Sequence, residues 1–189
     1  MSKEVWRAGT MLNPLPAVLV SCAHGGRSNL ITVAWTGTVC SDPAMLYISV
    51  RPERFSYNLI KESGEFTLNL TTRALTRATD WCGVRSGRDH DKWQECGLTP
   101  EPGRGVGCPS VKESPLSIEC KVVSVTELGS HHMFVARVVD VLVDPEYIDP
   151  QTGHLDLTRA GLMSYSHGHY YDLGRCLGHF GFSVRKKKK

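Results

Sequence analysis

Apolar and polar residues alternate with a period of two along much of the chain, which is the pattern of half-buried β-strands. Residues 29–39 are an example, because Ile31, Val33 and Trp35 fall on one face and the intervening positions fall on the other. Residues 17–23 form a more continuous apolar run, which predicts a buried strand. The predicted strands are 17–23, 29–39, 45–50, 65–71, 116–127 and 133–143.

Glycine and proline separate these strands at short intervals. The segment His24-Gly-Gly-Arg27 predicts a tight hairpin, because glycine adopts positive φ at little cost. Asp42-Pro43 ends the second strand, and Leu128-Gly-Ser-His-His132 is predicted as the loop between the last two. Hairpin connections without regularly spaced βαβ units predict a mainly β, antiparallel barrel with a few short helices, and argue against a Rossmann sheet.

Two short helices are predicted among the strands. The first starts at a polar turn with Ser56 as its N-cap and ends at Gly64, a residue suited to the left-handed C-terminal position. The second covers residues 72–81. Residues 83–110 are rich in glycine, proline and charge, so they are predicted to be a long, partly irregular excursion of the kind that is usually functional or mobile.

Length and composition describe an ordinary globular chain. The 189 residues and the apolar fraction of 41% predict one domain, residues 1–189, with a single hydrophobic core. No apolar run approaches the roughly 20 residues that span a bilayer. The first residues, 1–7, lack the apolar centre of a signal peptide, so we expect a cytoplasmic protein without a membrane partner.

The positive charge of the chain is concentrated at its end. The formal net charge of +3 includes five consecutive cations at residues 185–189, and without them acidic residues outnumber basic ones. Like-charged side chains of this kind repel and stay solvated, so we expect a disordered, dispensable tail and no nucleic-acid partner. Residues 180–184 are predicted as the last packed segment before the tail.

Seven cysteines are scattered along the chain without a Cys-x-x-Cys motif. This spacing argues against a zinc ribbon and against a secreted disulfide framework. Cys22, Cys40 and Cys120 lie in apolar strand contexts, where a free cysteine is usually a small buried hydrophobe. Cys82 and Cys96 flank a polar segment and are candidates for reactive thiols, although structural roles are the favoured interpretation for the cysteines as a group.

Two polar segments are candidate phosphate sites. Arg54 and Ser56 stand at a predicted helix start, where unpaired N–H groups and a partial positive charge favour anions, and arginine can bind phosphate oxygens in a fork. An ordinary capped surface helix would show the same pattern. Residues 82–93 combine glycines with several cations, and Ser86 and Lys92 could both contact a phosphate; the alternative is a solvated loop.

The positions of the histidines argue against a metal site, and the absence of catalytic motifs argues against catalysis by side chains alone. His131 and His132 are adjacent, so in a strand they would point to opposite faces, and no carboxylate or cysteine stands at a metal-ligand spacing. We therefore expect no metal site, and interpret His131 or His132 as a donor to a ligand or as part of a turn. No nucleophile, metalloprotease or P-loop motif is present, as would suit a protein whose bound cofactor carries the chemistry.

Several short segments together resemble the flavin reductase-like and flavoredoxin family, whose members have an FMN-binding split barrel. Each segment is a weak signal alone, but their order and spacing extend over nearly the whole chain. The matching segments are 13–20, 29–35, 41–43, 49–56, 66–70, 82–87 with 91–92, 128–131 and 178–183.

The resemblance implies a split β-barrel, a homodimer and one FMN per subunit near the dimer interface. It implies that the strand at 29–35 lines the isoalloxazine ring, and that the phosphate is bound at the Arg54/Ser56 turn with Ser86 and Lys92. His132 stands where the family often has an acidic or small residue. The cofactor-binding residues expected from this resemblance are Asn29, Thr32, Val33, Ala34, Trp35, Ser49, Arg51, Arg54, Ser56, Ser86, Lys92 and His131.

The implied reaction is electron transfer through FMN, with NADH or NADPH as the hydride donor and no catalytic side chain. The electrons would pass to a free flavin, a ferric complex or a protein partner. Two alternatives remain open at this point: a flavoredoxin-type electron carrier without a small substrate of its own, and a non-catalytic module that binds flavin or haem.

Overall fold

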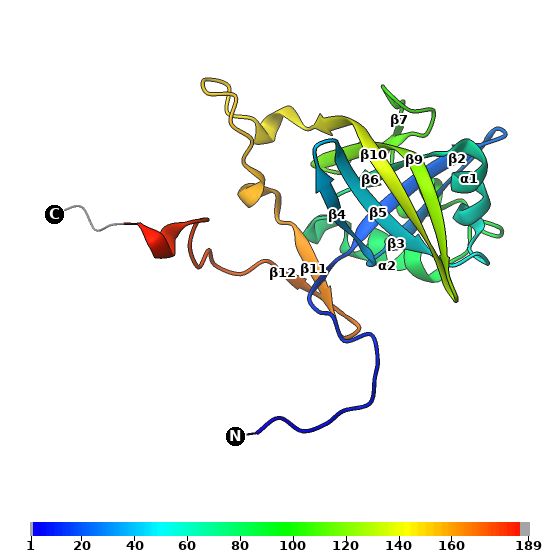
Figure 1. The fold of residues 1–189 in the computed structure, drawn as a ribbon. Helices are drawn as coiled ribbons and strands as arrows, with labels where there is room; N and C mark the ends of the chain where they lie inside the picture. The colour runs from blue at the N-terminus through cyan, green and yellow to red at the C-terminus, as the bar shows by residue number, and fades with distance from the viewer. Residues whose placement is uncertain (1, 186–189) are drawn as a thin grey trace.

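A seven-stranded antiparallel sheet forms the body of the protein in a computed structural model that describes residues 2–185 (Figure 1). The strand order is β3-β2-β6-β9-β10-β5-β4. The bounds are β2 Val18–His24, β3 Arg27–Val33, β4 Thr36–Ser41, β5 Ala44–Val50, β6 Glu65–Asn69, β9 Leu116–Leu128 and β10 His131–Val143. The mainly β, antiparallel fold predicted from the sequence is confirmed.

The sheet must curl into a barrel because its two edge strands are consecutive in the chain. Only Ala34 and Trp35 separate β3 from β4, and three Cα steps span at most about 11 Å. The backbone N–H of Ser49 in β5 donates to the carbonyl of Trp35 at 2.9 Å, which joins this connection to the opposite edge. The prediction of one continuous strand over 29–39 was therefore wrong, since the chain crosses from one edge to the other at Ala34 and Trp35.

The remaining elements are short strands, helices and 3-10 turns. A three-stranded sheet of order β1-β11-β12 and a two-stranded sheet of β7 and β8 lie beside the main sheet. Their bounds are β1 Leu15–Pro16, β7 Pro100–Glu101, β8 Ser110–Val111, β11 Met163–Ser166 and β12 His169–Asp172. The helices are α1 Phe55–Ser63, α2 Thr76–Val84 and α3 Lys92–Cys96, with 3-10 turns η1 Arg73–Leu75, η2 Pro145–Tyr147, η3 Leu157–Ala160 and η4 Phe182–Val184.

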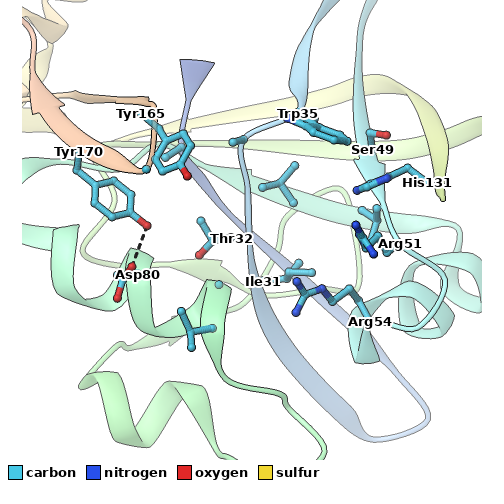
Figure 2. Close-up of a pocket in the computed structure, with 17 residues that line it drawn as sticks. Ile31, Thr32, Trp35, Ser49, Arg51, Arg54, Asp80, His131, Tyr165 and Tyr170 are labelled. Atoms are coloured by element: carbon cyan, nitrogen blue, oxygen red, sulfur yellow. Dashed lines mark hydrogen bonds between the residues drawn. The ribbon is translucent and has the colours of Figure 1, made fainter. Parts of the chain in front are cut away.

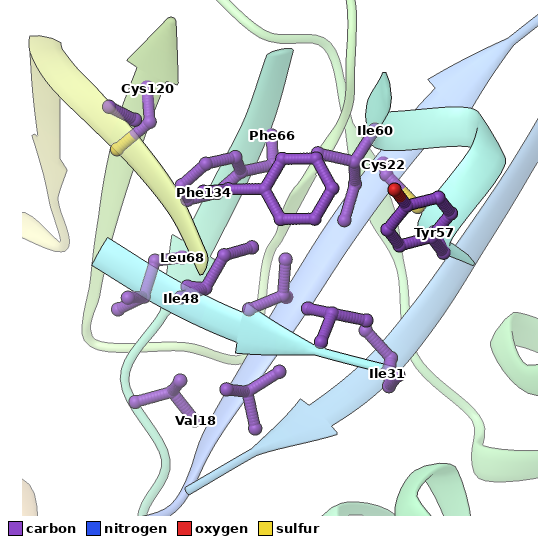
Figure 3. Packing of buried hydrophobic residues seen from close by; sticks show 14 of the residues in the cluster. Val18, Cys22, Ile31, Ile48, Tyr57, Ile60, Phe66, Leu68, Cys120 and Phe134 are labelled. Carbon is purple, nitrogen blue, oxygen red and sulfur yellow. The ribbon is translucent and has the colours of Figure 1, made fainter. Parts of the chain in front are cut away.

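Two hydrophobic clusters lie on opposite faces of β2 and β3. The first fills the barrel, where Phe66, Phe134 and Ile48 are fully buried (Figure 3). The second lies under α2 and α3 and contains Leu19 and Leu30. Because successive residues of a strand point to opposite faces, burial on both faces explains the continuous apolar run at the start of the sheet.

The polar turn before α1 differs from its prediction. The helix begins at Phe55 after an extended Arg54, and no side chain caps its first turn. Ser56 lies inside the helix, buried, and its hydroxyl accepts a hydrogen bond from the Asn29 side chain at 2.8 Å. Ser56 is therefore not the N-cap, because its side chain points to β3 and not to the helix start. Gly64 ends the helix with a φ of 68°, as predicted.

Other boundaries also shift. The strand predicted to reach 71 ends at Asn69, and the helix predicted at 72–81 is η1 followed by α2. Only Gly129 and Ser130 lie between β9 and β10, so His131 and His132 belong to a strand, and their placement in a hairpin loop was wrong.

The C-terminal end of the chain does not pack as predicted. Residues 173–185 run away from the barrel (Figure 1). Phe180 is fully exposed, and Phe182 and Val184 are also exposed, so 180–184 is not a packed segment of this chain. Of the tail at 185–189 that was predicted to be disordered, residues 186–189 lie outside the described residues. Within residues 2–185, no helix is long and apolar enough to cross a membrane.

Candidate functional site

A cavity of about 400 Å³ opens where the β3–β4 connection meets β5, α2 and the β11–β12 hairpin (Figure 2). We call it the aromatic cavity, because Trp35, His131, Tyr165 and Tyr170 contribute to its wall. Its lining residues are Ala17, Ile31, Thr32, Val33, Ala34, Trp35, Ser49, Val50, Arg51, Arg54, Asp80, Gly83, Val84, His131, Tyr165, Gly168 and Tyr170.

Trp35 and His131 form one side of the aromatic cavity. Their ring centroids are 4.4 Å apart with an interplanar angle of 43°. Partial burial, helped by the charge of Arg51, lowers the pKa of His131 below its ordinary value of 6.5, so the imidazole is mainly neutral at pH 7. The neighbouring His132 points the other way, and its Nδ1 lies 2.7 Å from the hydroxyl of the buried Tyr57. The two histidines therefore have different environments, as adjacent residues of a strand should.

The β11–β12 hairpin covers the other side of the aromatic cavity. His167 and Gly168 form its turn, both with positive φ. Tyr170 donates a hydrogen bond to the carboxylate of Asp80 in α2 at 3.2 Å (Figure 2). Burial, together with the negative charge of Asp80, raises the pKa of Tyr170 to about 12, so the phenol stays protonated and the bond persists at neutral pH.

A second cavity of about 370 Å³ shares Ile31 and Arg54 with the first. We call it the polar cavity, because cationic side chains and hydroxyl groups gather around it. Its lining residues are Asn29, Ile31, Glu53, Arg54, Phe55, Ser56, Cys82, Arg85, Ser86, Gly87, Arg88 and Lys92. The two cavities therefore meet at Arg54, with aromatic residues at one end and cations at the other.

The wall of the polar cavity depends on a close approach between β3 and the loop after α2. A Cβ atom added to Gly87 would lie 2.2 Å from Oδ1 of Asn29, which is closer than any normal contact. Asn29 is buried and holds Ser56 through the hydrogen bond described above. Glycine at position 87 thus lets the loop backbone reach the strand that carries Asn29.

Lys92 supplies a buried positive charge at the base of the polar cavity. Its ammonium group donates hydrogen bonds of 2.7 Å to the carbonyl oxygens of Leu30 and Cys82. Burial, and secondarily the charge of Arg54, lowers the pKa of Lys92. An ammonium group has three donors, so two backbone partners leave one for a ligand.

The structure brings the sequence-predicted residues together. Every residue predicted to bind the cofactor lines one of the two cavities, although contact with a cofactor stays a prediction. The aromatic cavity contains Thr32, Val33, Ala34, Trp35, Ser49, Arg51, Arg54 and His131. The polar cavity contains Asn29, Arg54, Ser56, Ser86 and Lys92.

Sequence reasoning missed the contribution of α2 and of the C-terminal hairpin. Asp80, Tyr165 and Tyr170 line the aromatic cavity, yet no sequence argument singled them out. The pairing of β11 with β1 brings the hairpin to the barrel. A signal was present, because two tyrosines flank a His-Gly turn in a short alternating segment, but nothing local indicates where that hairpin docks.

The two joined cavities fit a ligand with a flat ring at one end and an anionic group at the other. Trp35 and His131 offer ring faces for stacking, and cations and first-turn N–H groups of α1 suit a phosphate. Each volume falls within the range of small-molecule sites. Among the described residues, no group of three or more His, Cys, Asp and Glu side chains could hold a metal ion.

Comparisons with known proteins find a matching family model and similar structures. The family model described as the flavin reductase like domain matches residues 10–174. The structure is similar to the flavoredoxin of Desulfovibrio vulgaris (Miyazaki F), with a TM-score of 0.89 and 32% identity, over 97% of this chain and 100% of that one.

Two further relatives bear on the chemistry. An FMN-binding protein from Thermus thermophilus is similar with a TM-score of 0.77 and 25% identity, over 90% of this chain and 96% of that one. A ferric-chelate reductase (NAD(P)H) of Archaeoglobus fulgidus is 29% identical over 119 residues, which are 61% of this chain and 69% of that protein.

Proposed function

The chain belongs to the flavin reductase-like family, a flavoprotein family with a split-barrel fold, and we propose that it is an FMN-dependent oxidoreductase. In this proposal NADH or NADPH reduces the bound flavin, and the electrons pass to a free flavin or a ferric complex. The similarity to a ferric-chelate reductase (NAD(P)H) supports the donor and the acceptor class.

One observation carries the cofactor assignment: Arg54 lines both cavities. A ligand that follows the joined space from the aromatic end to the cationic end must pass this side chain. Riboflavin without its phosphate would use only the first cavity fully, whereas FMN would use both. The name of the Thermus thermophilus relative also supports FMN.

Each cavity has its own proposed part. Residues 32–35, with Ser49, Arg51 and His131, would hold the isoalloxazine ring. Arg54, Ser56, Ser86 and Lys92 would hold the phosphate, and the side chain of Asn29 keeps Ser56 in place through its hydrogen bond. Arginine supplies a forked charge-assisted contact, and the buried ammonium supplies a second.

The bound FMN would accept a hydride and release electrons singly or in pairs, which is chemistry that no side chain of this chain needs to perform. The chain binds and orients the ring, and its aromatic wall excludes water from one side. The lowered pKa of His131 favours its neutral form, which would offer a hydrogen bond without adding a charge near the ring. The proposed enzyme therefore works through position and electrostatics, without a general acid or base.

A flavoredoxin-type electron carrier is the second candidate function. The structural similarity to the flavoredoxin of Desulfovibrio vulgaris (Miyazaki F) favours it. Such a carrier would hold FMN but would oxidise NADH and NADPH only at a negligible steady-state rate, because its partner would be another protein.

We also propose a cytoplasmic homodimer. The apolar side chains Val139 and Val141 of β10, and Trp6, Leu177 and Phe180 of the two terminal arms, are exposed, and a second copy could cover them. All seven cysteines are free thiols, which suits a reducing compartment. Sedimentation at micromolar concentration should give a dimer, and a flavin-loaded monomer would contradict this.

The experiment that tests the function starts with reconstitution. The purified chain is mixed with FMN, FAD or riboflavin, desalted, and the retained flavin is released and measured per chain. We expect one FMN per chain and weak retention of riboflavin. Retention of FAD alone, or of no flavin, would reject the proposal. Steady-state oxidation of NADH and NADPH with a ferric complex or free flavin then separates a reductase from an electron carrier.

A further inference from the structure

Two cysteine thiols meet where α2 packs against α3. The Sγ atoms of Cys82 and Cys96 are 3.8 Å apart, and the residues are 14 positions apart in the chain. Cys82 is buried in the last turns of α2, whereas Cys96, the last residue of α3, is partly exposed. Neither the proposed flavin chemistry nor the phosphate contacts use this pair.

The two thiols face different spaces. Cys82 lines the polar cavity, and Cys96 lines a third cavity of about 640 Å³ between α2 and α3, which we call the outer cavity. Trp81 and Leu98 contribute to the wall of the outer cavity, together with charged residues. A small reagent can therefore approach the sulfur of Cys96 from outside, while Cys82 remains sheltered behind it.

We propose that Cys82 and Cys96 form a thiol–disulfide exchange site for a low-molecular-weight disulfide, and that the resulting protein disulfide closes the loop carrying the polar cavity. The Cys96 thiolate attacks one sulfur of the incoming disulfide, forms a mixed disulfide and expels one thiolate. The Cys82 thiolate then attacks the sulfur of Cys96 and expels the other. The two cysteines lose two electrons and two protons, and the incoming disulfide gains them as two thiols.

The surroundings allow the bond to form. A disulfide needs an S–S distance of about 2.05 Å, so the sulfurs must approach by roughly 2 Å. The start of α3 is fixed, because Lys92 donates to the carbonyl of Cys82 and Trp93 is buried. The end of α3 is held as well, because the N–H groups of Gly97 and Leu98 donate to the carbonyls of Gln94 and Trp93. The approach must therefore come mainly from rotation of the two cysteine side chains, and Cys96 is only partly buried.

The order of the two attacks follows from exposure and from the protonation of the thiols. Burial raises the pKa of Cys82 to about 12 and also raises the pKa of Cys96, where Glu95 adds to the effect and Lys92 and Arg77 oppose it. Glu113 also lines the outer cavity. The more accessible Cys96 reacts first, and exchange accelerates as the pH rises towards the pKa of its thiol.

The consequence for the polar cavity comes from chain connectivity. The segment between the two cysteines contains Arg85, Ser86, Gly87, Arg88 and Lys92, all of which line that cavity. A bond between its ends removes the open conformations in which this segment leaves β3. Oxidation should therefore keep this segment packed against β3, so that the polar cavity stays formed. Reduction should allow the segment to leave β3 more often.

The test uses the full chain in redox buffers of reduced and oxidised glutathione. Remaining thiols are blocked with iodoacetamide, and the digest is analysed by mass spectrometry. We expect a linked Cys82–Cys96 peptide with the mass of two hydrogens lost. Cys82→Ala should instead retain one glutathione on Cys96, whereas Cys96→Ala should retain none on Cys82. Cys176→Ala, which removes an exposed thiol elsewhere, is the control and should still form the link.

A second readout measures closure of the loop. Trypsin cleaves after Arg85 and Arg88, and cleavage at these exposed sites should be about tenfold slower in the oxidised chain, because the cross-link suppresses local opening. Cys96→Ala should be cleaved at the same rate in both buffers. Absence of the linked peptide, or a link without slower cleavage, would overturn the proposal. Neither readout requires flavin, so a failure here is distinct from a failure of the proposed function.

Discussion

The aromatic cavity and the polar cavity share a side chain but are built differently. Two runs of consecutive residues, 31–35 and 49–51, form one wall of the aromatic cavity, at positions fixed by the crossing from β3 to β4 and by the register of β5. The polar cavity depends on the loop after α2, which is held against β3 by Lys92 and by the close approach at Gly87. The sheet thus sets the shape of the aromatic cavity, and the loop with the start of α3 gives the polar cavity most of its positive charge.

This difference makes the two regions separable by mutation. Substitutions in the loop should change cofactor affinity or local stability, while the barrel stays intact. Substitutions around the aromatic cavity should have smaller effects on affinity, because each ring contact is one of many. The four substitutions below test this division.

The largest effect is expected where the two cavities meet. Arg54→Ala should weaken FMN binding by about 1.5–3 kcal/mol, because one charge-assisted phosphate contact is lost. Quenching of flavin fluorescence during titration gives the Kd. Arg137→Ala removes an exposed arginine of β10 that lines neither cavity, and is the control for charge. Equal losses in both variants would show that Arg54 contributes only through net charge.

The next effect tests the close approach of the loop. Gly87→Ala should lower the free energy of unfolding by about 1–3 kcal/mol, because the added methyl group displaces Asn29 and breaks its hydrogen bond to Ser56. Urea unfolding of the apoprotein measures the change. At Gly107 an added Cβ would meet only Glu65 at 3.5 Å, so Gly107→Ala should be close to neutral. A neutral Gly87→Ala would mean that the loop is not held tightly to β3.

A smaller effect is expected at the hairpin over the aromatic cavity. Tyr170→Phe removes the hydrogen bond to Asp80 and should cost about 0.5–1.5 kcal/mol, mostly as faster local opening of β12. Hydrogen exchange of the β11–β12 amides is the appropriate measurement. Tyr171→Phe is the control, because the Tyr171 side chain is exposed and its hydroxyl has no hydrogen-bond partner among residues 2–185. Identical exchange rates in both variants would show that the hydrogen bond to Asp80 does not stabilise the hairpin.

The smallest effect is a pH dependence at His131. Its pKa in the folded chain lies below 6.5, so the unfolded chain binds the proton more readily. Stability of the apoprotein should therefore fall as the pH drops from about 6.5 through the folded pKa, and become level with respect to this group below it. His131→Gln should remove that part of the slope in urea unfolding series, whereas His154→Gln, in an exposed loop, should preserve it. If the slope of the unfolding free energy against pH is unchanged in His131→Gln, the pH dependence comes from other groups.

Much of the fold could be predicted from local patterns. The hairpin at Gly25 and Gly26 forms as predicted, with both glycines at positive φ, and Gly64 ends α1. Cys22 and Cys120 are buried as expected, whereas Cys40 is only partly buried. The break at Ala34 and Trp35 was missed, because the alternating pattern continues through it. That crossing follows from closure of the barrel, a property of the whole sheet that no local window contains.

Some residues of the candidate site could be grouped from local sequence, whereas others are brought together only by tertiary packing. Residues 29–33 share β3, and Ala34 and Trp35 follow them directly, so an argument from one stretch of chain could gather them. Arg54 and Lys92 are distant in sequence, and only the docking of α3 against β3 explains why they approach the same cavity. Ser56 was placed in the cavity for the wrong local reason, since it contacts Asn29 and does not cap the helix. Tyr170 reaches the site through pairing of segments from opposite ends of the chain.

The buried ammonium of Lys92 has a practical consequence for anyone who handles the apoprotein. Lys92 lies in a cavity that is also lined by Arg54, Arg85 and Arg88, against one acidic residue, Glu53, and this excess of positive charge favours small anions from solution. Inorganic phosphate or sulfate in a storage buffer should occupy this region, raise the melting temperature and compete with flavin. The choice of buffer anion therefore becomes a variable in every binding measurement on this protein.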